Sequence, residues 1–228
     1  MRKTWRSIPY KPSHVFGLTK EPLLESCLCR IDWWEEFEDR SGYDLREKRE
    51  KPGIYGEFIL HFETLKQIII KNPIFTVMEI GVHRTNNTYK SSTIAILEAL
   101  SRKKNSTFYL GIDLEEKHFL EQQYDNCLTI KTSSDNQYKI RKTLEERDIS
   151  QLDLLLIDGD HSIEMMINDW KYADLLREGG LVIFHDVSFH PGPKLIYQCI
   201  DEKLFEKTAI EIPGDWGFAL CRRRYLNE

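Results

Sequence analysis

Two apolar stretches that stop at acidic and imidazole side chains constrain this chain more than any other feature. The first is Leu154–Ile157, followed by Asp158, and the second is Leu181–Phe184, followed by His185 and Asp186. An apolar run of strand length that ends in charged residues is typical of a buried strand in a parallel sheet. Ligands of open α/β sheets bind at the carboxyl ends of such strands. We therefore expect both stretches to be neighbouring strands that open onto one cleft.

Strands and helices are predicted to alternate from Pro73 to the end of the chain. The spacing of apolar residues predicts an amphipathic helix over 57–71, which Pro73 stops. Such alternation implies βαβ units, a parallel sheet and helices on both of its faces. Turn residues at 213–215 predict a hairpin between the last two strands. The predicted strands are 75–80, 108–113, 128–131, 152–157, 181–184, 207–212 and 217–221, and the predicted helices are 92–100, 136–147, 162–176 and 193–203.

Length and composition fit one α/β domain of 228 residues with an N-terminal extension. Residues 1–72 are irregular and rich in aromatic side chains, with a candidate helix over 23–39, and we expect them to form a lid on the domain formed by 73–228. The net charge of -5 argues against nucleic acid or an anionic membrane as a partner. The chain has neither a membrane-spanning stretch nor a signal-peptide core, so we expect a cytoplasmic protein. The sequence is compatible with both a monomer and a homo-oligomer.

The five cysteines have no spacing typical of a disulfide framework. Cys127, Cys199 and Cys221 lie in apolar segments, where we expect them to be small core residues. Cys27 and Cys29 are closer together than the usual zinc-binding pair and have no second pair, so they predict a metal site only weakly.

Gly81 and Asp113 suit a ligand of the adenosine type. Gly81 follows the first predicted strand, and Asp113 ends the second about thirty residues later. Glycine lets the backbone approach a ligand, and an acid at the second position can accept hydrogen bonds from two ribose hydroxyls. A glycine at a strand end is also ordinary in a turn, so the spacing alone leaves ligand binding and a plain turn as alternatives.

Ser134 and Asp135 follow the short third strand, where a loop can contact a purine. The favoured alternative is that one of these side chains caps the helix predicted over 136–147, and both roles are compatible.

The densest group of polar residues contains Asp158 and His161. Hard divalent cations prefer oxygen ligands and tolerate one imidazole, so Asp158, Asp186 and His185 are candidate ligands for Mg²⁺. A histidine side chain titrates at about pH 6.5, which makes His161 a candidate base for a substrate hydroxyl.

Several neighbours of this group have structural interpretations. Asp160 or Ser162 is expected to cap the helix predicted over 162–176. Asp169, on the same helix, is expected at the surface or beside a cation. His190 lies in a loop rich in turn residues and is expected to be solvated, with contact to a substrate as the less favoured alternative.

Four motifs together resemble the class I S-adenosylmethionine-dependent methyltransferases. They are VMEIGV at 77–82, GID at 111–113, IDGDHS at 157–162 and GGLVIFHD at 179–186. The resemblance extends over about two thirds of the chain and is closest to the small-molecule O-methyltransferases, which include cephalosporin-hydroxylase-like and macrolide-sugar enzymes. It implies an α/β fold with a Rossmann-like, doubly wound sheet of seven mostly parallel strands and an antiparallel closing hairpin.

The resemblance also implies roles for individual residues. Glu79 and Gly81 match positions beside the methionine and ribose of the cofactor, Asp113 matches the acid that holds the ribose, and Ser134 or Asp135 matches the adenine side. Asp158 matches a ligand of the metal-dependent relatives, and His185 with Asp186 matches the pair that completes their metal site. The predicted cofactor-binding residues are Glu79, Gly81, Val82, Asp113, Ser134, Asp135 and Asp158.

The sequence therefore predicts methyl transfer from S-adenosylmethionine to a hydroxyl of a small polar acceptor, such as a sugar or a natural product. His161 and Asp158 are the predicted catalytic residues, and Mg²⁺ is a candidate cofactor. One alternative is a degenerate relative that binds a nucleotide or a partner without turnover, because the loop from Val82 to Ser92 lacks the family's glycines. A nicotinamide-dependent oxidoreductase is a second alternative, which the closing hairpin disfavours.

Overall fold

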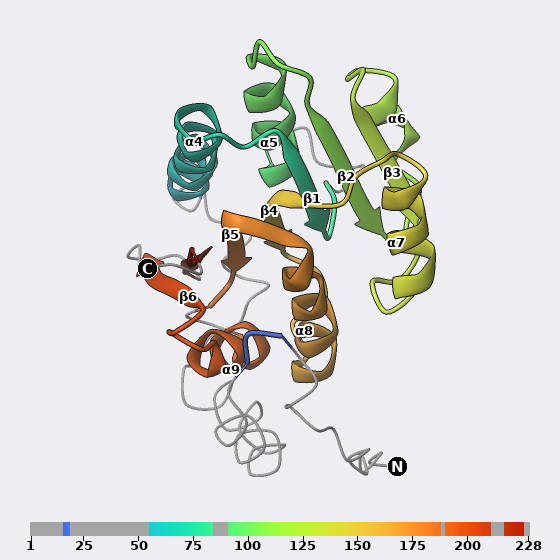
Figure 1. Ribbon diagram of the computed structural model, residues 1–228. Coiled ribbons are helices and arrows are strands. Elements are labelled where there is room, and N and C mark those ends of the chain that lie inside the picture. Colours follow the sequence, from blue (N-terminus) through green and yellow to red (C-terminus); the bar gives the residue numbers. More distant parts are fainter. Residues whose placement is uncertain (1–15, 19–54, 84–90, 188–189, 211–216, 226–228) are drawn as a thin grey trace, which may run out of the picture.

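The sheet has seven strands in the order β3-β2-β1-β4-β5-β7-β6 (Figure 1). The computed structural model describes residues 16–18, 55–83, 91–187, 190–210 and 217–225. Strands β1 to β5 pair in parallel, and β7 is antiparallel to both β5 and β6. The predicted fold class is therefore confirmed, including the closing pair of strands. The strands are β1 (Thr76–Ile80), β2 (Phe108–Asp113), β3 (Cys127–Lys131), β4 (Leu152–Ile157), β5 (Leu176–His185), β6 (Phe205–Ile210) and β7 (Phe218–Arg223).

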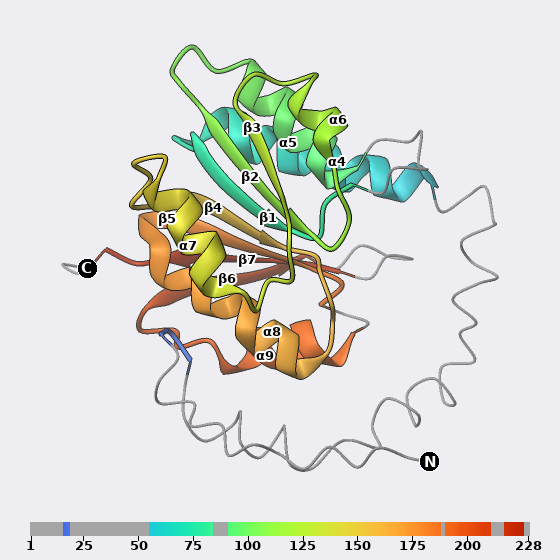
Figure 2. The same ribbon diagram turned by 90° about the vertical axis from the view of Figure 1, so that its right-hand side faces the viewer.

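Helices cover both faces of the sheet, as buried parallel strands require. Figure 2 shows α4, α5 and α6 on one face and α7, α8 and α9 on the other. None of the helices in the described part of the chain is long and apolar enough to cross a membrane. The helices are α4 (Tyr55–Lys71), α5 (Ser92–Ser101), α6 (His118–Glu121), α7 (Gln137–Glu145), α8 (Ile163–Trp170), the 3-10 helix η2 (Lys171–Leu175) and α9 (Pro191–Cys199).

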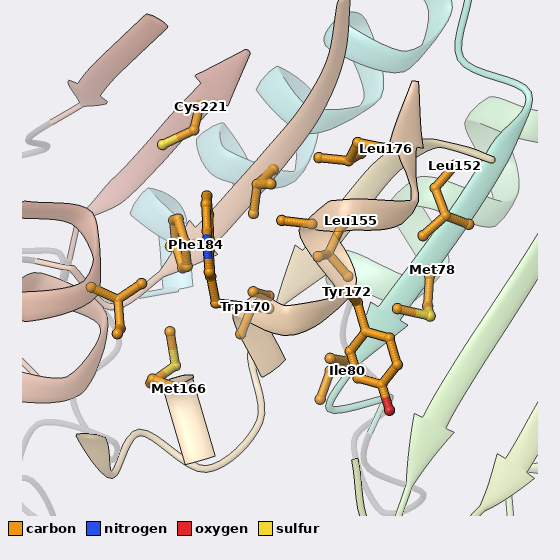
Figure 3. Close-up of a cluster of buried hydrophobic side chains, with 14 of the residues drawn as sticks. Met78, Ile80, Leu152, Leu155, Met166, Trp170, Tyr172, Leu176, Phe184 and Cys221 are labelled. Atoms are coloured by element: carbon orange, nitrogen blue, oxygen red, sulfur yellow. The ribbon is translucent and has the colours of Figure 1, made fainter. Parts of the chain in front are cut away.

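The core beneath α7, α8 and α9 is centred on Trp170. Its ring stacks on Phe184 of β5, with centroids 5.5 Å apart and an angle of 14° between the planes (Figure 3). The indole Nε1 of Trp170 donates a hydrogen bond of 2.7 Å to the carbonyl of Phe16. Leu18 forms an isolated β-bridge with Ile200. The stretch 16–18 therefore packs against residues from the C-terminal third of the sequence.

The core on the opposite face is formed by α4 and α5 over β1 and β4. Leu65 and Ile69 of α4 are buried in it together with Ile96 of α5 and Leu154 of β4. The helix predicted over 57–71 is thus confirmed, and α4 ends before Pro73 as expected. The candidate helix over 23–39 lies outside the described residues, and the lid role of 1–72 stays a prediction.

Strand β5 is longer than predicted, and the helix before it is shorter. The structure has α8 end at Trp170, a 3-10 helix follow it, and β5 begin at Leu176. Gly179 has a φ of 75°, and the pairing with β4 shifts register between Leu152 and Leu154, so this first part of the strand is irregular. An irregular stretch lacks the apolar run from which a strand is predicted.

Asp153 of β4 binds groups from several strands at the amino-terminal edge of the sheet. Its Oδ2 accepts hydrogen bonds from the backbone N–H groups of Phe75 at 2.7 Å and Thr76 at 2.9 Å. Its Oδ1 pairs with Arg177 of β5, which also donates to the carbonyl of Pro73 at 2.7 Å. One carboxylate thus joins the starts of β1, β4 and β5.

The cysteines of the described residues fit the expectation of small core side chains. Cys199 and Cys221 are buried, and Cys127 is half-buried. Burial raises the pKa of Cys127 and of Cys221 to about 12, so both thiols stay protonated at neutral pH. Cys27 and Cys29 lie outside the described residues.

Candidate active site

The strand ends bring the predicted site residues to one edge of the sheet. Ile80 at the end of β1 pairs with Ile112 of β2 on one side and with Ile157 of β4 on the other. Gly81 follows β1 with a φ of 86°, and a Cβ there would lie 2.0 Å from the carbonyl oxygen of Asp158. Only glycine fits this left-handed position against neighbouring backbone.

Asp113 is held by backbone donors at the end of β2. Its Oδ2 accepts a hydrogen bond of 2.9 Å from the N–H of Val82, and its Oδ1 accepts one of 2.8 Å from Glu115. The buried ammonium of Lys117 lies 3.9 Å from Oδ1. Each carboxylate oxygen can accept more than one hydrogen bond, so this acid is oriented and still able to bind two hydroxyls.

Glu79 of β1 is fully buried rather than open at the edge. Ser92, the first residue of α5, donates a hydrogen bond of 2.6 Å to its Oε1, and the hydroxyl of Tyr109 donates to its Oε2. Burial raises the pKa of Glu79 to about 7, against the opposing effect of these hydrogen bonds. The contacts tie α5 to β1 directly beneath Gly81, and direct contact with a cofactor stays a prediction.

The loop after β3 differs in detail from the prediction of a helix cap. Asn136, not Ser134 or Asp135, is the N-cap of α7, and its side chain accepts a hydrogen bond from the N–H of Lys139. The capping prediction for Ser134 and Asp135 is therefore wrong by one position. Ser134 is buried and its carbonyl accepts a 2.6 Å hydrogen bond from Tyr172, whereas Asp135 is exposed.

Five side chains gather after β4 and β5, and we call them the acid–histidine cluster: Asp158, His161, His185, Asp186 and His190. His185 Nδ1 lies 2.6 Å from Asp186 Oδ1 and 3.4 Å from Asp158 Oδ1. Burial alone lowers the pKa of His185, but the two carboxylates raise it well above its usual value. Burial likewise raises the pKa of Asp158, while His185 and His161 pull it below its usual range. The two carboxylates therefore favour the protonated form of His185 over the neutral form.

His161 faces the same two carboxylates from the other side. Its Nε2 lies 3.6 Å from Asp158 Oδ1 and 3.5 Å from Asp186 Oδ2. This nitrogen is buried and makes no hydrogen bond with the residues that the structure describes. A polar atom at a buried position normally has a partner, and one without a partner often marks a site for a ligand, an ion or catalysis.

His190 belongs to the acid–histidine cluster, so its expected place as a solvated loop residue is wrong. Its ring stacks on that of His161, with centroids 4.4 Å apart and 13° between the planes, and its Nε2 lies 3.7 Å from Asp186 Oδ2. Burial and the neighbouring His161 lower the pKa of His190 to about 4. The spacing of four residues from Asp186 is the signal that sequence analysis passed over.

Local turns position these side chains. Ser162 caps α8 by accepting a hydrogen bond from Met165, and Asp160 accepts one of 2.7 Å from the N–H of Ser162, as predicted for this pair. Asp186 has a φ of 62°, which is uncommon for a residue other than glycine and recurs at functional sites. A Cβ on Gly192 would lie 2.1 Å from the carbonyl oxygen of His161, so the start of α9 packs directly against the loop after β4.

Asp169 is buried, and the expectation of a surface position is wrong. The residue is 0% exposed, and its Oδ2 has no hydrogen-bond partner among the described residues. Burial raises the pKa of Asp169 to about 7. The carboxyl lies beneath the turn at Gly159, where a Cβ would be 3.6 Å from Oδ2. A charged residue on a helix is usually solvated, so sequence alone gave no reason to bury it.

The middle of α4 reaches the same edge. Phe62 and Leu65 line a small hollow together with Asp158 and His185, and aromatic Phe218 of β7 forms another wall. The polar residues of its lining are Asp158, His185 and Ser92, and the others are apolar. The described part of the N-terminal segment thus contributes directly to the surroundings of the site.

The acid–histidine cluster has the chemistry to hold a divalent cation. Two groups of three ligands have all their ligand atoms within 4.8 Å of one another, and both include Asp186. The predicted group adds Asp158 and His185, and the other adds His161 and His190. The carboxylates suit a hard ion such as Mg²⁺, the imidazoles suit borderline transition metals, and His161 Nε2, which has no hydrogen-bond partner among the described residues, is available to a transition metal.

Comparison with known proteins agrees with this geometry. A family model described as a methyltransferase domain matches residues 87–187. No curated protein sequence matches the chain. Among solved structures, the O-methyltransferase from Bacillus cereus in complex with SAH has a TM-score of 0.52 and 17% identity, and the match covers 86% of this chain and 100% of that one.

Two further structures come from biosynthetic pathways. The MycE methyltransferase from the mycinamycin pathway, in complex with Mg, SAH and mycinamycin VI, has a TM-score of 0.51 and 13% identity, and the match covers 83% of this chain but only 63% of that one. CalS11, a TDP-rhamnose 3'-O-methyltransferase of calicheamicin biosynthesis, has a TM-score of 0.51 and 15% identity over 72% of this chain and 77% of that one. The strand order is that of the Rossmann-like methyltransferase fold, and the methyltransferase domain model matches 101 of the 228 residues of this chain.

Proposed function

We propose that the protein methylates a hydroxyl group of a small polar acceptor, such as a sugar or a natural product. The observation that carries this proposal is the buried, unbonded Nε2 of His161, which lies between Asp158 and Asp186. It lies at the same sheet edge as Gly81 and Asp113, and the carboxylate of Asp113 offers hydrogen-bond acceptors to an adenosyl group. The names of MycE, CalS11 and the Bacillus cereus enzyme support this class of acceptor.

In this proposal, the residues at the ends of β1 and β2 bind the cofactor. Asp113, fixed by the N–H groups of Val82 and Glu115, would accept hydrogen bonds from the ribose hydroxyls. Gly81 lets the chain after β1 pass close to the backbone of Asp158 because it has no Cβ. When bound, S-adenosylmethionine supplies a methyl group on a positively charged sulfur, which departs as a neutral thioether. Most of the catalysis is then placement of the acceptor oxygen in line with that methyl group.

His161 removes the proton that the acceptor oxygen must lose. Its Nε2 takes the hydroxyl proton as general base. The carboxylates of Asp158 and Asp186, 3.6 and 3.5 Å away, stabilise the imidazolium that results. A divalent ion held by Asp158, Asp186 and His185 would help by lowering the pKa of the bound hydroxyl, and Mg²⁺ is the ion named for MycE.

Two measurements test the proposal. Calorimetry with S-adenosylmethionine and with S-adenosylhomocysteine should show binding in the micromolar range. A methyl-transfer assay against pooled hydroxylated metabolites, with Mg²⁺ and with chelator, should then detect product, and His161→Ala should abolish it. Absence of cofactor binding up to millimolar concentration would support the alternative of a degenerate relative instead. Full activity in chelator would remove the metal from the mechanism and leave His161 as the base.

A further inference from the structure

We propose that His161, His190 and Asp186 form a binding site for a transition-metal ion such as Zn²⁺. We call these three residues the two-histidine set. The set is distinct from the predicted group of Asp158, His185 and Asp186, although both share Asp186. Its occupation would withdraw His161 from its role as base.

The distances within the two-histidine set fit a tetrahedral ion. Asp186 Oδ2 lies 3.5 Å from His161 Nε2 and 3.7 Å from His190 Nε2. Zinc binds nitrogen and oxygen at about 2.0–2.1 Å, which puts neighbouring tetrahedral ligand atoms roughly 3.3–3.4 Å apart. Because the rings of His161 and His190 are stacked almost parallel, one imidazole would have to rotate so that both Nε2 lone pairs point at the ion. His161 Nε2, which lacks a hydrogen-bond partner among the described residues, would then have one.

The donor atoms favour a transition metal over Mg²⁺. Two imidazoles and one carboxylate are the ligands of many zinc and iron sites, whereas Mg²⁺ prefers carboxylates, phosphates and water. The two groups also use different oxygens of Asp186. Oδ1 faces His185, whereas Oδ2 faces His161 and His190.

The fold holds the two-histidine set in place before any ion arrives. His161 and His190 stack at 4.4 Å, and the start of α9 at Gly192 packs against the backbone of His161. The N–H of His190 donates a 3.0 Å hydrogen bond to the carbonyl of Asp186, which links the backbones of these two residues. Ligands whose backbone is fixed in this way lose less conformational freedom on binding.

The effect on catalysis rests on the proposed function. His161 Nε2 cannot accept a proton from a hydroxyl while it donates its lone pair to a metal ion. Zn²⁺ should therefore inhibit methyl transfer by occupying the two-histidine set. Mg²⁺, which binds imidazole weakly, should not inhibit in this way.

The binding test uses Zn²⁺ and Co²⁺ with the full chain after treatment with chelator. Thiolates also bind zinc, so the background carries Cys27→Ser and Cys29→Ser. Calorimetry should show a zinc site in this background, and the visible absorption of bound Co²⁺ should show nitrogen and oxygen ligands. Loss of a group that merely supports a metal ligand costs 10–100-fold in affinity, so His190→Ala, which removes a ligand, should weaken zinc binding by about 100-fold. His118→Ala is the matched control, because this histidine lies on α6 with a side chain that is 64% exposed.

Three results would overturn the proposal. The first is that the background protein does not bind zinc, and the second is that His190→Ala binds zinc as tightly as the background protein. The third is that His185→Ala loses zinc binding while His190→Ala keeps it, which would place the ion in the predicted group of Asp158, His185 and Asp186. Circular dichroism checks that each variant is folded, and His190→Gln repeats the test with a side chain of similar size.

The activity test is separate from the binding test. Each variant is compared with its own rate without zinc, and zinc should inhibit the background protein much more strongly than His190→Gln. Equal inhibition of both would overturn the link to His161. If no methyl transfer is found under any condition while His190→Ala still loses zinc, the proposed function fails and the metal site stands.

Discussion

Strand β4 has a carboxylate near each of its ends, and the two have opposite surroundings. Asp153, at the amino edge, has backbone donors from Phe75 and Thr76 and an ion pair with Arg177. Asp158, at the carboxyl edge, lies in the acid–histidine cluster, where His161 Nε2 has no hydrogen bond with the described residues. A satisfied carboxylate stabilises a fold, whereas a group of incompletely paired ionisable side chains is ready to bind or react.

The contrast extends to the backbone. The left-handed φ of 62° at Asp186 and the close contact between Gly81 and Asp158 both occur at the carboxyl edge. Strained backbone conformations of this kind cost free energy. They persist where the surrounding structure enforces them, and they are common at functional sites. The variants below test whether the amino edge serves stability and the carboxyl edge serves activity.

Asp186→Asn should have the largest effect, and it should fall on activity. The variant removes a charge that stabilises the His161 imidazolium, so we expect kcat to fall on the order of 10³-fold, or about 4 kcal/mol. Steady-state kinetics on the acceptor found in the pooled assay measures this. Cofactor affinity serves as the control and should change little. Near-normal kcat would show that the acid–histidine cluster does not act in the chemical step.

Asp153→Ala should affect stability instead. It leaves Arg177 and two backbone N–H groups without their acceptor, and loss of one partner of a largely buried pair costs about 3 kcal/mol in free energy of unfolding. Urea denaturation measures the loss, and kcat per folded molecule should remain that of the unmodified protein. A fall in kcat without a fall in stability would break the comparison between the two edges.

Asp113→Ala should weaken cofactor binding to an intermediate degree. Removal of an acceptor for charged hydrogen bonds costs about 1–3 kcal/mol, which is roughly a 5–150-fold rise in the dissociation constant. Calorimetry with S-adenosylhomocysteine measures this change. Lys117→Ala is a useful partner variant, because its ammonium lies beside the same carboxylate without facing the open edge. Unchanged affinity in Asp113→Ala would place the cofactor elsewhere.

Glu79→Gln should change the pH dependence of stability. The folded pKa of Glu79, about 7, lies above the ordinary value of 4.5, so the folded state holds the proton more tightly. The associated stabilisation is present below about pH 4.5 and is lost as pH rises through about 7, on the order of 3 kcal/mol in all.

The variant lacks this contribution, so its stability should fall less than that of the unmodified protein between pH 5 and 8. Urea denaturation at several pH values measures the difference. Asp169→Asn is the matched comparison, since burial raises the pKa of Asp169 to about 7 as well. Parallel pH curves for Glu79→Gln and the unmodified protein would show that Glu79 is ionised in the folded state.

The sequence predicts the sheet well because apolar runs and turn residues are local signals. Each predicted strand exists, and Asp158, His185 and Asp186 lie together because parallel strands end at one edge. His190 and Asp169 were misplaced for the opposite reason. Their burial depends on the packing of α9 against the loop after β4 and on the turn at Gly159, and neither contact leaves a periodic pattern in the sequence.

The short stretch around Gly17 has a consequence for how the chain is made. It leaves the ribosome well before Trp170 and Ile200, yet it satisfies the indole of one and pairs with the backbone of the other. A Cβ on Gly17 would lie 2.7 Å from the ring of Phe205, so the fit is close. Contacts between such distant positions form slowly. During translation this early segment must wait for nearly the whole domain to emerge, and chaperone binding to it would delay completion of the fold.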